Sequence, residues 1–465
     1  MLAILSALLP IATLVVMLTV VKAAAYRAAL VAFAVGAAEA LWLHGQSVRD
    51  VLACAWTGAA TGLFPIGLVI IAALFTYAIT VESGAIAEIK DGLKKLSDDR
   101  RFFVLLTVWG FGNFMEGMAG FGTAVAVPCA ILVGVGFDPL KAVLCCLVAN
   151  TTPTAFGSVG VPTMVLASET ALDLARLSST IAVLQIAATA LTPFLLVYIV
   201  DGRRGLRETW GLAALSAVAF LVPWLLVAAT LGCELPDIVG GLCVMATLAC
   251  RGNRESLDAR RQLWAWLPFG FVVILLALAA ALPLPFKISP GFLILAAAFA
   301  GGRCQRVPWG RLAKLLLTTL RTYALALVTI CLVLALAKVM GHAGMTRTLA
   351  SALVAMTGRG YAAVASVVGS LGGFVTGSGT SSNVLFGALQ ASAGASEAQR
   401  FLFAAANVMG AGIGKMVCPQ SIVLGCAAAG LAGRESEVMK AVFRYFLIVL
   451  AVACLATCAM TFCAT

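Results

Sequence analysis

One acid and one base stand inside two long apolar, glycine-rich regions of this 465-residue chain. Glu116 lies within Gly110–Gly122, and Lys415 lies within Gly412–Met416. A charged side chain is expensive at the centre of an apolar segment and therefore indicates a function. We interpret Glu116 as a proton-carrying group, or alternatively as a carboxylate that caps a half-helix or is held by a fixed basic partner. Lys415 either pairs with a substrate carboxylate or neutralises Glu116 without a substrate role.

Small hydroxyl and amide side chains gather in the same two regions. In the first region they are Asn150, Thr151, Thr152 and Ser158. In the second they are Thr376, Ser378, Thr380, Ser381, Ser382, Asn383, Asn407, Gln420 and Ser421. Such groups suit a small polar anion whose hydration they replace. The alternative is helix–helix packing by small residues, which is weaker for the asparagines because an unpaired amide in lipid is costly.

Other kinds of site find little support. The only histidines, His44 and His342, lie outside the two glycine-rich regions, so proton coupling falls to a carboxylate by elimination. Most of the 14 cysteines sit inside apolar runs without metal-ligand spacing. The sequence contains no Walker motif, so ATP-driven transport by this chain alone is excluded, and no dinucleotide fingerprint. It also lacks a His, Cys/His or Asp/Asp constellation, so we predict no enzyme, no cofactor and no metal site.

The composition indicates that the protein lies in a membrane. Hydrophobic residues make up 62% of the chain and charged residues only 11%, against about 25% charged in soluble domains. These values, with a mean hydropathy of +1.05, exclude a soluble enzyme, a nucleic-acid-binding protein and a disordered chain. The apolar runs are too long for an outer-membrane barrel. The net charge of +11 is therefore interpreted through membrane topology.

Apolar runs of spanning length punctuate the chain. They lie near 3–21, 28–43, 51–81, 177–200, 208–231, 236–250, 264–283, 288–302, 312–340 and 440–463. The two glycine-rich regions, about 102–168 and 360–433, must each cross the membrane an odd number of times. The loops between spans fall into two alternating sets, and the basic residues are divided unevenly between them: one set contains 21 and the other contains 5. The positive-inside rule then places both termini outside.

The sequence also repeats itself. At an offset of 260 residues Gly84 matches Gly344 and Gly117 matches Gly377, and after a slip to 257 the pair Ala149–Asn150 matches Ala406–Asn407. The charge-derived topology gives the two copies opposite directions. Inverted repeats with broken helices at matching positions are typical of secondary transporters, because irregular backbone at membrane depth must line protein or a water-filled cavity.

We therefore predict an all-α polytopic membrane protein with inverted-topology repeats, broken or re-entrant helices and about twelve crossings. The predicted organisation is two N-terminal spans (1–50), a first transport repeat (51–200), connecting spans (201–311) and a second transport repeat (312–465).

Four blocks resemble the bacterial L-lactate permease family. They are Phe114–Gly122, Asn150–Gly157, Thr376–Asn383 and Gly414–Ile422, and they occur in the family's order. The resemblance covers most of 51–200 and 312–460. It implies a proton-coupled symporter of 2-hydroxymonocarboxylates, such as L-lactate, D-lactate and glycolate, in the bacterial cytoplasmic (inner) membrane. Two departures stand out: Gly379 replaces the Asp or Asn usual in the third block, and the chain is shorter than typical members.

The predicted function is thus secondary active transport by alternating access. Glu116 would couple the proton, Lys415 would pair with the substrate carboxylate, and the polar groups near 150–152 and 378–383, with Asn407, Gln420 and Ser421, would bind the substrate. The predicted partners are a small monocarboxylate anion, a proton and the lipid bilayer. The alternatives are a sodium-coupled or dicarboxylate carrier of similar architecture, and an anion channel. The sequence leaves the oligomeric state open.

Overall fold

The computed structural model describes residues 1–465 except 1, 22, 121, 253–257, 282–288 and 464–465. The described residues form helices joined by turns, with no strand among them, which agrees with the all-α prediction. Helices suit an apolar solvent because they satisfy their backbone N–H and C=O groups internally. Three of the basic residues counted in the loops, Lys22, Arg254 and Lys287, and Phe121 of the first family block lie outside the described residues.

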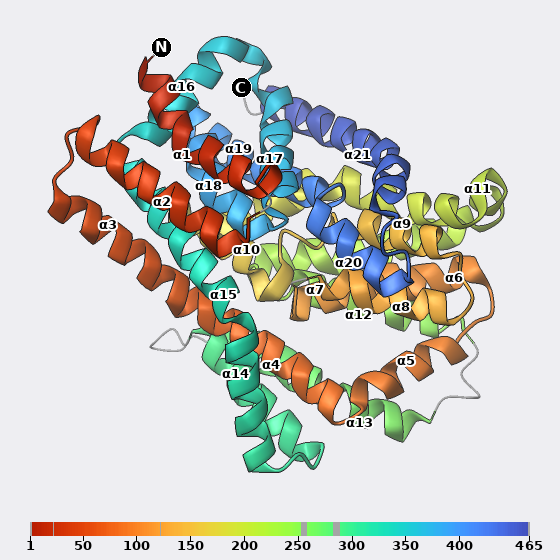
Figure 1. The fold of residues 1–465 in the computed structure, drawn as a ribbon. Coiled ribbons are helices and arrows are strands. Elements are labelled where there is room, and N and C mark those ends of the chain that lie inside the picture. The colour runs from red at the N-terminus through yellow and green to blue at the C-terminus, as the bar shows by residue number, and fades with distance from the viewer. Residues whose placement is uncertain (1, 22, 121, 253–257, 282–288, 464–465) are drawn as a thin grey trace.

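The first half of the chain contains α1 to α11 (Figure 1). The bounds are α1 (Leu2–Thr19), α2 (Ala25–Trp42), α3 (Val48–Thr61), the π-helix η1 (Gly62–Gly67), α4 (Leu68–Glu82), α5 (Ala85–Lys95), α6 (Arg100–Val104), the π-helix η2 (Leu105–Gly112), α7 (Asn113–Met118), α8 (Thr123–Gly134), α9 (Pro139–Ala149), α10 (Gly157–Thr170) and α11 (Leu174–Thr230).

The second half contains α12 to α21. The bounds are α12 (Pro236–Ala249), α13 (Ala259–Ala281), α14 (Pro290–Cys304), α15 (Trp309–His342), α16 (Met345–Thr357), the 3-10 helix η3 (Gly358–Gly360), α17 (Tyr361–Thr376), α18 (Gly379–Ala393), α19 (Glu397–Lys415), α20 (Pro419–Ala429) and α21 (Glu435–Cys463).

Several helices can cross a membrane. Within the described part of the chain, six helices are long and apolar enough, and the bent pair α19–α20 makes a seventh span if counted as one. One of the six, α11, has 57 residues and is kinked at Gly202 and Thr209, so it contains both predicted spans 177–200 and 208–231. The protein is therefore a multi-pass membrane protein. Shorter apolar helices such as α12 and α14 leave the count of about twelve crossings a prediction.

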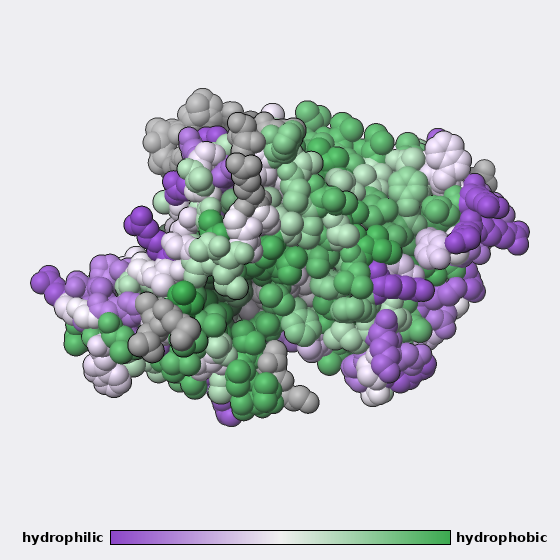
Figure 2. Space-filling model, turned by 90° about the horizontal axis from the view of Figure 1, so that it is seen from above, coloured by the Kyte–Doolittle hydropathy of each residue, from purple (hydrophilic) through white to green (hydrophobic). Residues whose placement is uncertain are grey.

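The outer surface matches a lipid environment. Large apolar side chains are exposed along α3, where Trp56 is 76% and Leu52 63% exposed. Figure 2 shows apolar residues across the middle of the visible face, with hydrophilic residues gathered toward its two sides. Such a continuous apolar surface is unusual on a soluble monomer and is expected where lipid replaces water.

The same order of helices occurs twice. The continuous segment Val48–Glu82 corresponds to Trp309–His342 at the sequence offset of about 260. Each segment is followed by a glycine in the left-handed region, Gly84 (φ 79°) and Gly344 (φ 76°), which begins the short helices α5 and α16. At these turns glycine is favoured because it has no Cβ to clash at positive φ.

The helix pairs that precede the two long segments extend this correspondence. α1 packs on α2 and α16, whereas α13 packs on α14 and α5. Each pair precedes one of the two long segments, and the first helix of the pair packs on the short helix that follows the other long segment. We propose that α1–α2 and α13–α14 belong to the repeat units as well, which leaves the second part of α11 and α12 as the connection.

The two copies are inverted. Gly58 of the first long segment lies against Ala335 of the second. Further along the first segment Glu82 pairs with Arg311, which lies earlier in the second. The corresponding helices therefore cross antiparallel, as the inverted repeat predicts.

Each glycine-rich region folds into a hairpin followed by a broken helix. In the first, α6 to α7 run inward and α8 returns, so that Arg100 donates a hydrogen bond to the Gly136 carbonyl (3.3 Å). In the second, α17 and α18 form the hairpin, and the Tyr361 hydroxyl donates to Gln390 Oε1 (2.7 Å). The broken helices are α9–α10 and α19–α20, the latter bent by 41°.

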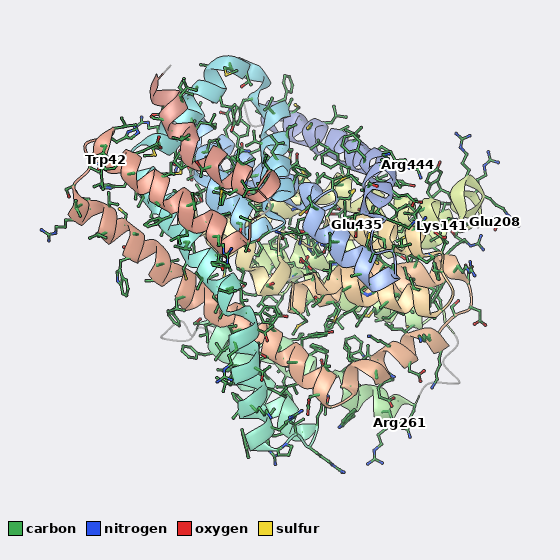
Figure 3. All side chains as sticks on the ribbon, in the orientation of Figure 1. Trp42, Lys141, Glu208, Arg261, Glu435 and Arg444 are labelled. Carbon is green, nitrogen blue, oxygen red and sulfur yellow. The ribbon has the colours of Figure 1, made fainter. Side chains whose placement is uncertain are left out.

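Polar contacts join α6 and α9 to α11 at one end of the molecule. Lys141 donates to the Val200 carbonyl (2.8 Å) and Arg101 pairs with Glu208. Figure 3 shows Lys141 and Glu208 on the side of the molecule opposite Trp42. Burial acts to raise the pKa of Asp99 at this end, but hydrogen bonds from Arg101 outweigh it and hold the pKa below its ordinary value.

Candidate anion-binding site

Four helices of the described chain begin around one cavity. α8 follows Gly122, the α10 segment begins at Gly157 and becomes regular helix from Val161, α18 begins at Gly379 and α20 begins at Pro419. These three glycines line the cavity, as does Gln420 in the first turn of α20. A helix N-terminus presents backbone N–H groups without intrahelical partners and the positive end of the helix dipole. The cavity is therefore suited to an anion.

The turn between α17 and α18 is built by local sequence. Gly377 ends α17 in the left-handed region (φ 65°), where glycine is favoured because it has no Cβ. Ser378 then caps α18, accepting a hydrogen bond from the Ser381 N–H (3.3 Å). The Ser378 N–H in turn donates to Thr376 Oγ1 (3.2 Å).

The start of α10 is strained. Ser158 (φ 48°), Val159 (φ 56°) and Gly160 (φ 77°) are all left-handed, which is rare for a β-branched residue. Val159 is fully buried, and Ser158 donates to the Ala119 carbonyl (3.2 Å) at the neighbouring helix break. Such strain persists only where surrounding contacts hold it, and it concentrates at functional sites.

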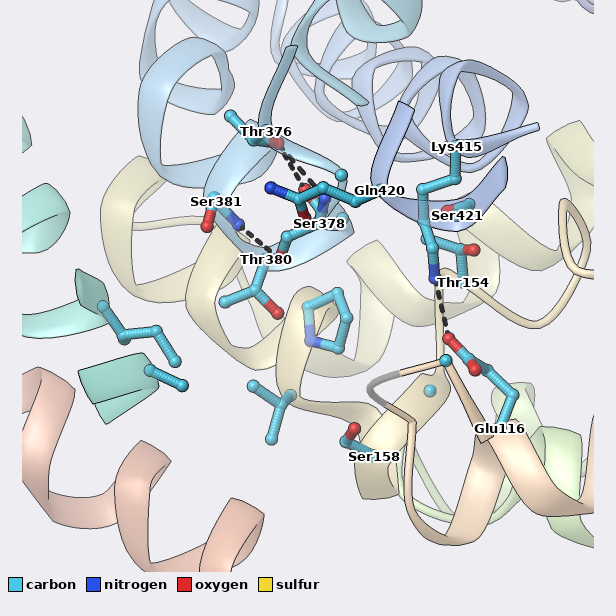
Figure 4. Close-up of a pocket in the computed structure, with 18 of the residues that line it drawn as sticks. Glu116, Thr154, Ser158, Thr376, Ser378, Thr380, Ser381, Lys415, Gln420 and Ser421 are labelled. Carbon is cyan, nitrogen blue, oxygen red and sulfur yellow. Dashed lines mark hydrogen bonds and ion pairs between the residues drawn. The ribbon is translucent and has the colours of Figure 1, made fainter. Parts of the chain in front are cut away.

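The cavity has a volume of about 270 Å³. It brings together residues from both copies of the repeat, as Figure 4 shows. The predicted site residues that line it are Glu116, Asn150, Ser378, Thr380, Ser381, Lys415, Gln420 and Ser421, joined by Ser158 and Thr376. It extends from the exposed Gln420 to the buried Glu116 and Lys415.

Glu116 and Lys415 form an ion pair at the buried end of the cavity. Lys415 Nζ lies 2.8 Å from Glu116 Oε1, and the two side chains are 10% and 4% exposed. The pair joins α7 of the first copy to α19 of the second. Glu116 Oε2 is buried and has no hydrogen-bond partner among the described residues. In this state Lys415 neutralises Glu116, while both remain at the cavity wall.

Gly157 makes room for this pair. A Cβ at this position would lie 3.2 Å from Glu116 Cγ and 3.4 Å from Glu116 Oε1. A Cβ here would require Glu116 to shift by a few tenths of an ångström.

Five predicted site residues do not line the cavity. Thr151, Thr152, Ser382, Asn383 and Asn407 are all buried behind it. Thr151 donates to the Val148 carbonyl (2.9 Å), and Ser382 donates to the Gly369 carbonyl (3.3 Å). These bonds are structural in the described state.

The two buried asparagines connect the elements of the site. Asn407 Nδ2 donates to Asn383 Oδ1 (2.9 Å), and Asn383 Nδ2 donates to the Pro162 carbonyl (2.9 Å). This chain of bonds links α19, α18 and α10. The asparagines therefore hold the hairpin and both broken helices in register.

Sequence reasoning missed two residues. Thr154 lines the cavity and donates to the Asn150 carbonyl (2.8 Å); its signal was its place within the second family-like block, Asn150–Gly157. Asp237, at the start of α12, is 1% exposed and interacts electrostatically with Glu116 and Lys415. An acid at the edge of a short apolar run carried no distinguishing signal.

The model of the L-lactate permease family matches residues 3–288 and 276–464 of the chain. The chain belongs to the L-lactate permease family. The L-lactate permease of Streptococcus iniae is 37% identical over 385 residues, covering 75% of this chain and 81% of that protein. The L-lactate permease of Bacillus subtilis is 31% identical, covering 97% and 95%. Glycolate permease GlcA of Escherichia coli is 31% identical, covering 95% and 92%.

Gly379 is a position at which the chain departs from the family pattern. The resemblance of the third block implied Asp or Asn at this position. Here a Cβ would lie 2.6 Å from Thr154 Cγ2, so the larger side chain would displace Thr154 from the cavity wall. The absence of a side chain at 379 leaves that part of the wall to Thr154.

Proposed function

We propose that this protein is a proton-coupled symporter of small 2-hydroxymonocarboxylates, lactate and glycolate, in the cytoplasmic membrane. The observation that carries the proposal is the Glu116–Lys415 pair at a cavity where four helix N-termini meet. The named relatives include permeases for both L-lactate and glycolate.

Coupling follows from the charges of the pair. When a substrate carboxylate binds to Lys415, Glu116 loses its partner and becomes a buried uncompensated anion. Such a charge is strongly unfavourable in a low-dielectric site, so Glu116 takes up a proton. One anion and one proton thus enter the site together. The helices then expose the loaded site to the opposite side by alternating access.

The remaining polar groups fit a small hydroxy acid. Free N–H groups at the start of α18 and α20 suit the carboxylate. The hydroxyls of Thr380, Ser381 and Ser421, with the Gln420 amide, suit the 2-hydroxyl, because each supplies both donor and acceptor capacity. Lys415 is the only base among the described residues that line the cavity, which favours one carboxylate over two.

The test is uptake of labelled L-lactate and glycolate into proteoliposomes with an imposed inward proton gradient. We expect accumulation that a protonophore abolishes and that a sodium gradient cannot replace. Propionate, which lacks the hydroxyl, should compete at least about tenfold less well, because it leaves polar groups of the cavity wall unpaired. Accumulation driven by sodium, or flux without accumulation, would replace the proposal with a sodium carrier or a channel.

The decisive variant is Glu116→Gln, which mimics the protonated acid. It should lose gradient-driven accumulation at least about tenfold yet keep substrate exchange, because exchange requires no net proton movement. Glu39→Gln is the matched control, since Glu39 is a buried acid on α2 that is absent from the cavity wall. A Glu116→Gln protein that still accumulates substrate in response to a proton gradient removes the coupling role.

A further inference from the structure

A second buried acid lies beside the coupling site. Asp237 is 1% exposed in the first turn of α12. Trp224 Nε1 donates to Asp237 Oδ1 (2.8 Å), whereas Asp237 Oδ2 is buried without a hydrogen-bond partner in the described part of the chain. Trp224 needs only one acceptor, which a neutral amide would supply equally well. The charge-bearing second oxygen therefore remains unexplained by structure alone.

Close packing places this acid against Gly117, the residue that follows Glu116. α12 packs on α7, and a Cβ at Gly117 would lie 2.9 Å from Asp237 Cβ. Glu116 lines the cavity, whereas Asp237 is absent from the cavity wall. Trp224, which holds Asp237, also packs edge-on against Phe156 with ring centroids 5.3 Å apart. Phe156 precedes Gly157, the glycine that makes room for Glu116.

The charged neighbours of Asp237 are few. Among the described elements packed on α12, α7 contributes Glu116, while η2 and the facing part of α11 (residues 210–230) contain no charged residue. Lys415 of α19 also interacts with Asp237, and Glu234 stands in the preceding turn. Of these, Glu116 and Lys415 interact electrostatically with Asp237, whereas Glu234 does not, so two carboxyls and one ammonium share a site of low dielectric.

The two carboxyls are arranged alike. Each has one oxygen fixed by a donor, Lys415 Nζ on Glu116 and Trp224 Nε1 on Asp237. Each has a second oxygen that is buried and unpartnered within the described chain. Two acids beside one base in such a site are neutral when the acids hold one proton between them. While Lys415 is paired with Glu116, that proton belongs on Asp237.

We propose that Asp237 is a proton-relay residue that supplies Glu116, an inference that rests on the proposed symport. When Lys415 turns to the substrate, the O–H bond on Asp237 breaks and an O–H bond forms on Glu116, directly or through one bridging water. The Asp237 carboxylate left behind is stabilised by Trp224 and by the N-terminus of α12. A proton from solution then restores the acid, so substrate and proton reach the site by separate routes.

The test compares Asp237→Asn with Asp237→Glu in proteoliposomes. Asparagine still accepts the hydrogen bond from Trp224 but carries no proton. We expect gradient-driven uptake of L-lactate to fall at least about tenfold in maximal rate. The KM for lactate, the rate of lactate exchange and the pH dependence of exchange should stay at wild-type values. Asp237→Glu should restore much of the rate, which a purely structural role does not predict.

Two results would overturn the relay. One is wild-type uptake by folded Asp237→Asn protein. The other is loss of both uptake and exchange without rescue by glutamate, which would make Asp237 a structural residue. Failure of the proposed symport is distinguishable, because it shows as missing proton-driven uptake in the wild type or as retained coupling in Glu116→Gln. The control is again Glu39→Gln, a buried acid whose Oε2 is also unpartnered within the described residues and whose helix packs on α1, α3 and α15.

Discussion

At the scale of single residues, the site depends on one buried ion pair. Glu116 and Lys415 are 299 positions apart in sequence and 2.8 Å apart in space. Taking both charges out of water is costly, and their attraction offsets that cost only while they stay together. Each residue therefore controls the charge state that the other can tolerate, which is the property that a coupling device needs.

Loss of the Glu116–Lys415 pair should lower the stability of the protein as well as its transport. We expect Lys415→Met to destabilise the protein by about 3–5 kcal/mol, because it leaves Glu116 buried without a cation. The double variant Glu116→Gln with Lys415→Met should recover most of that loss but not bind substrate. Thermal unfolding of the single and double variants in detergent measures the coupling between the two sites. Additive losses would mean that the two charges do not depend on each other.

At the scale of elements, glycines let the helices of the site approach one another closely. α17 and α19 pack through Gly369 and Gly373 on one side and Gly410 and Gly414 on the other. Both pairs have the small-xxx-small spacing that brings helix backbones together in membranes. A Cβ at Gly410 would clash with the Ser366 carbonyl. The hairpin and the broken helix are thereby held against each other without large side chains.

This packing predicts opposite effects for two glycine substitutions. Gly410→Ala should lower the free energy of unfolding by about 2 kcal/mol, because overpacking forces the helices apart. Gly270→Ala on α13, where nothing lies within 4 Å of the new methyl group, should be neutral or stabilising by up to about 1 kcal/mol. Unfolding temperatures in detergent check both variants. Equal effects at the two positions would contradict close backbone packing between α17 and α19.

At the scale of the whole molecule, the inverted copies place the site where they meet. The Arg176–Glu397 pair joins the copies at one end and the Glu82–Arg311 pair joins them at the other. Each copy contributes one hairpin and one broken helix to the cavity. An inverted pair of units can in principle exchange conformations, which opens a shared site to each side in turn.

The predicted orientation can be tested with exposed cysteines. Cys250 and Cys304 are exposed and lie beside basic loops that we place in the cytoplasm. In variants that retain only one of them, a membrane-impermeant maleimide should react only after the cells are permeabilised. A cysteine introduced by Arg49→Cys, at an exposed position in the opposite set of loops, should react in intact cells. The reverse pattern would place both termini in the cytoplasm.

The sequence alone predicted the chemistry and the architecture. An acid and a base inside apolar regions are conspicuous because such placements are costly. The repeat was detectable because glycine, asparagine and proline are required at matching breaks. The prediction reached the family through the same blocks, and eight of the thirteen predicted site residues lie on the cavity wall.

Only the tertiary structure decided which polar groups face the cavity. Asn383 and Asn407 were indistinguishable in sequence from the lining residues, but they hydrogen-bond to each other and to the Pro162 carbonyl instead. Asp237 became significant only because α12 folds back onto Gly117. Composition and spacing can be interpreted from the sequence, because a polar group in lipid is costly at any position in the chain. Contacts between residues far apart in sequence depend on how helices pack, and that is determined by the whole chain together.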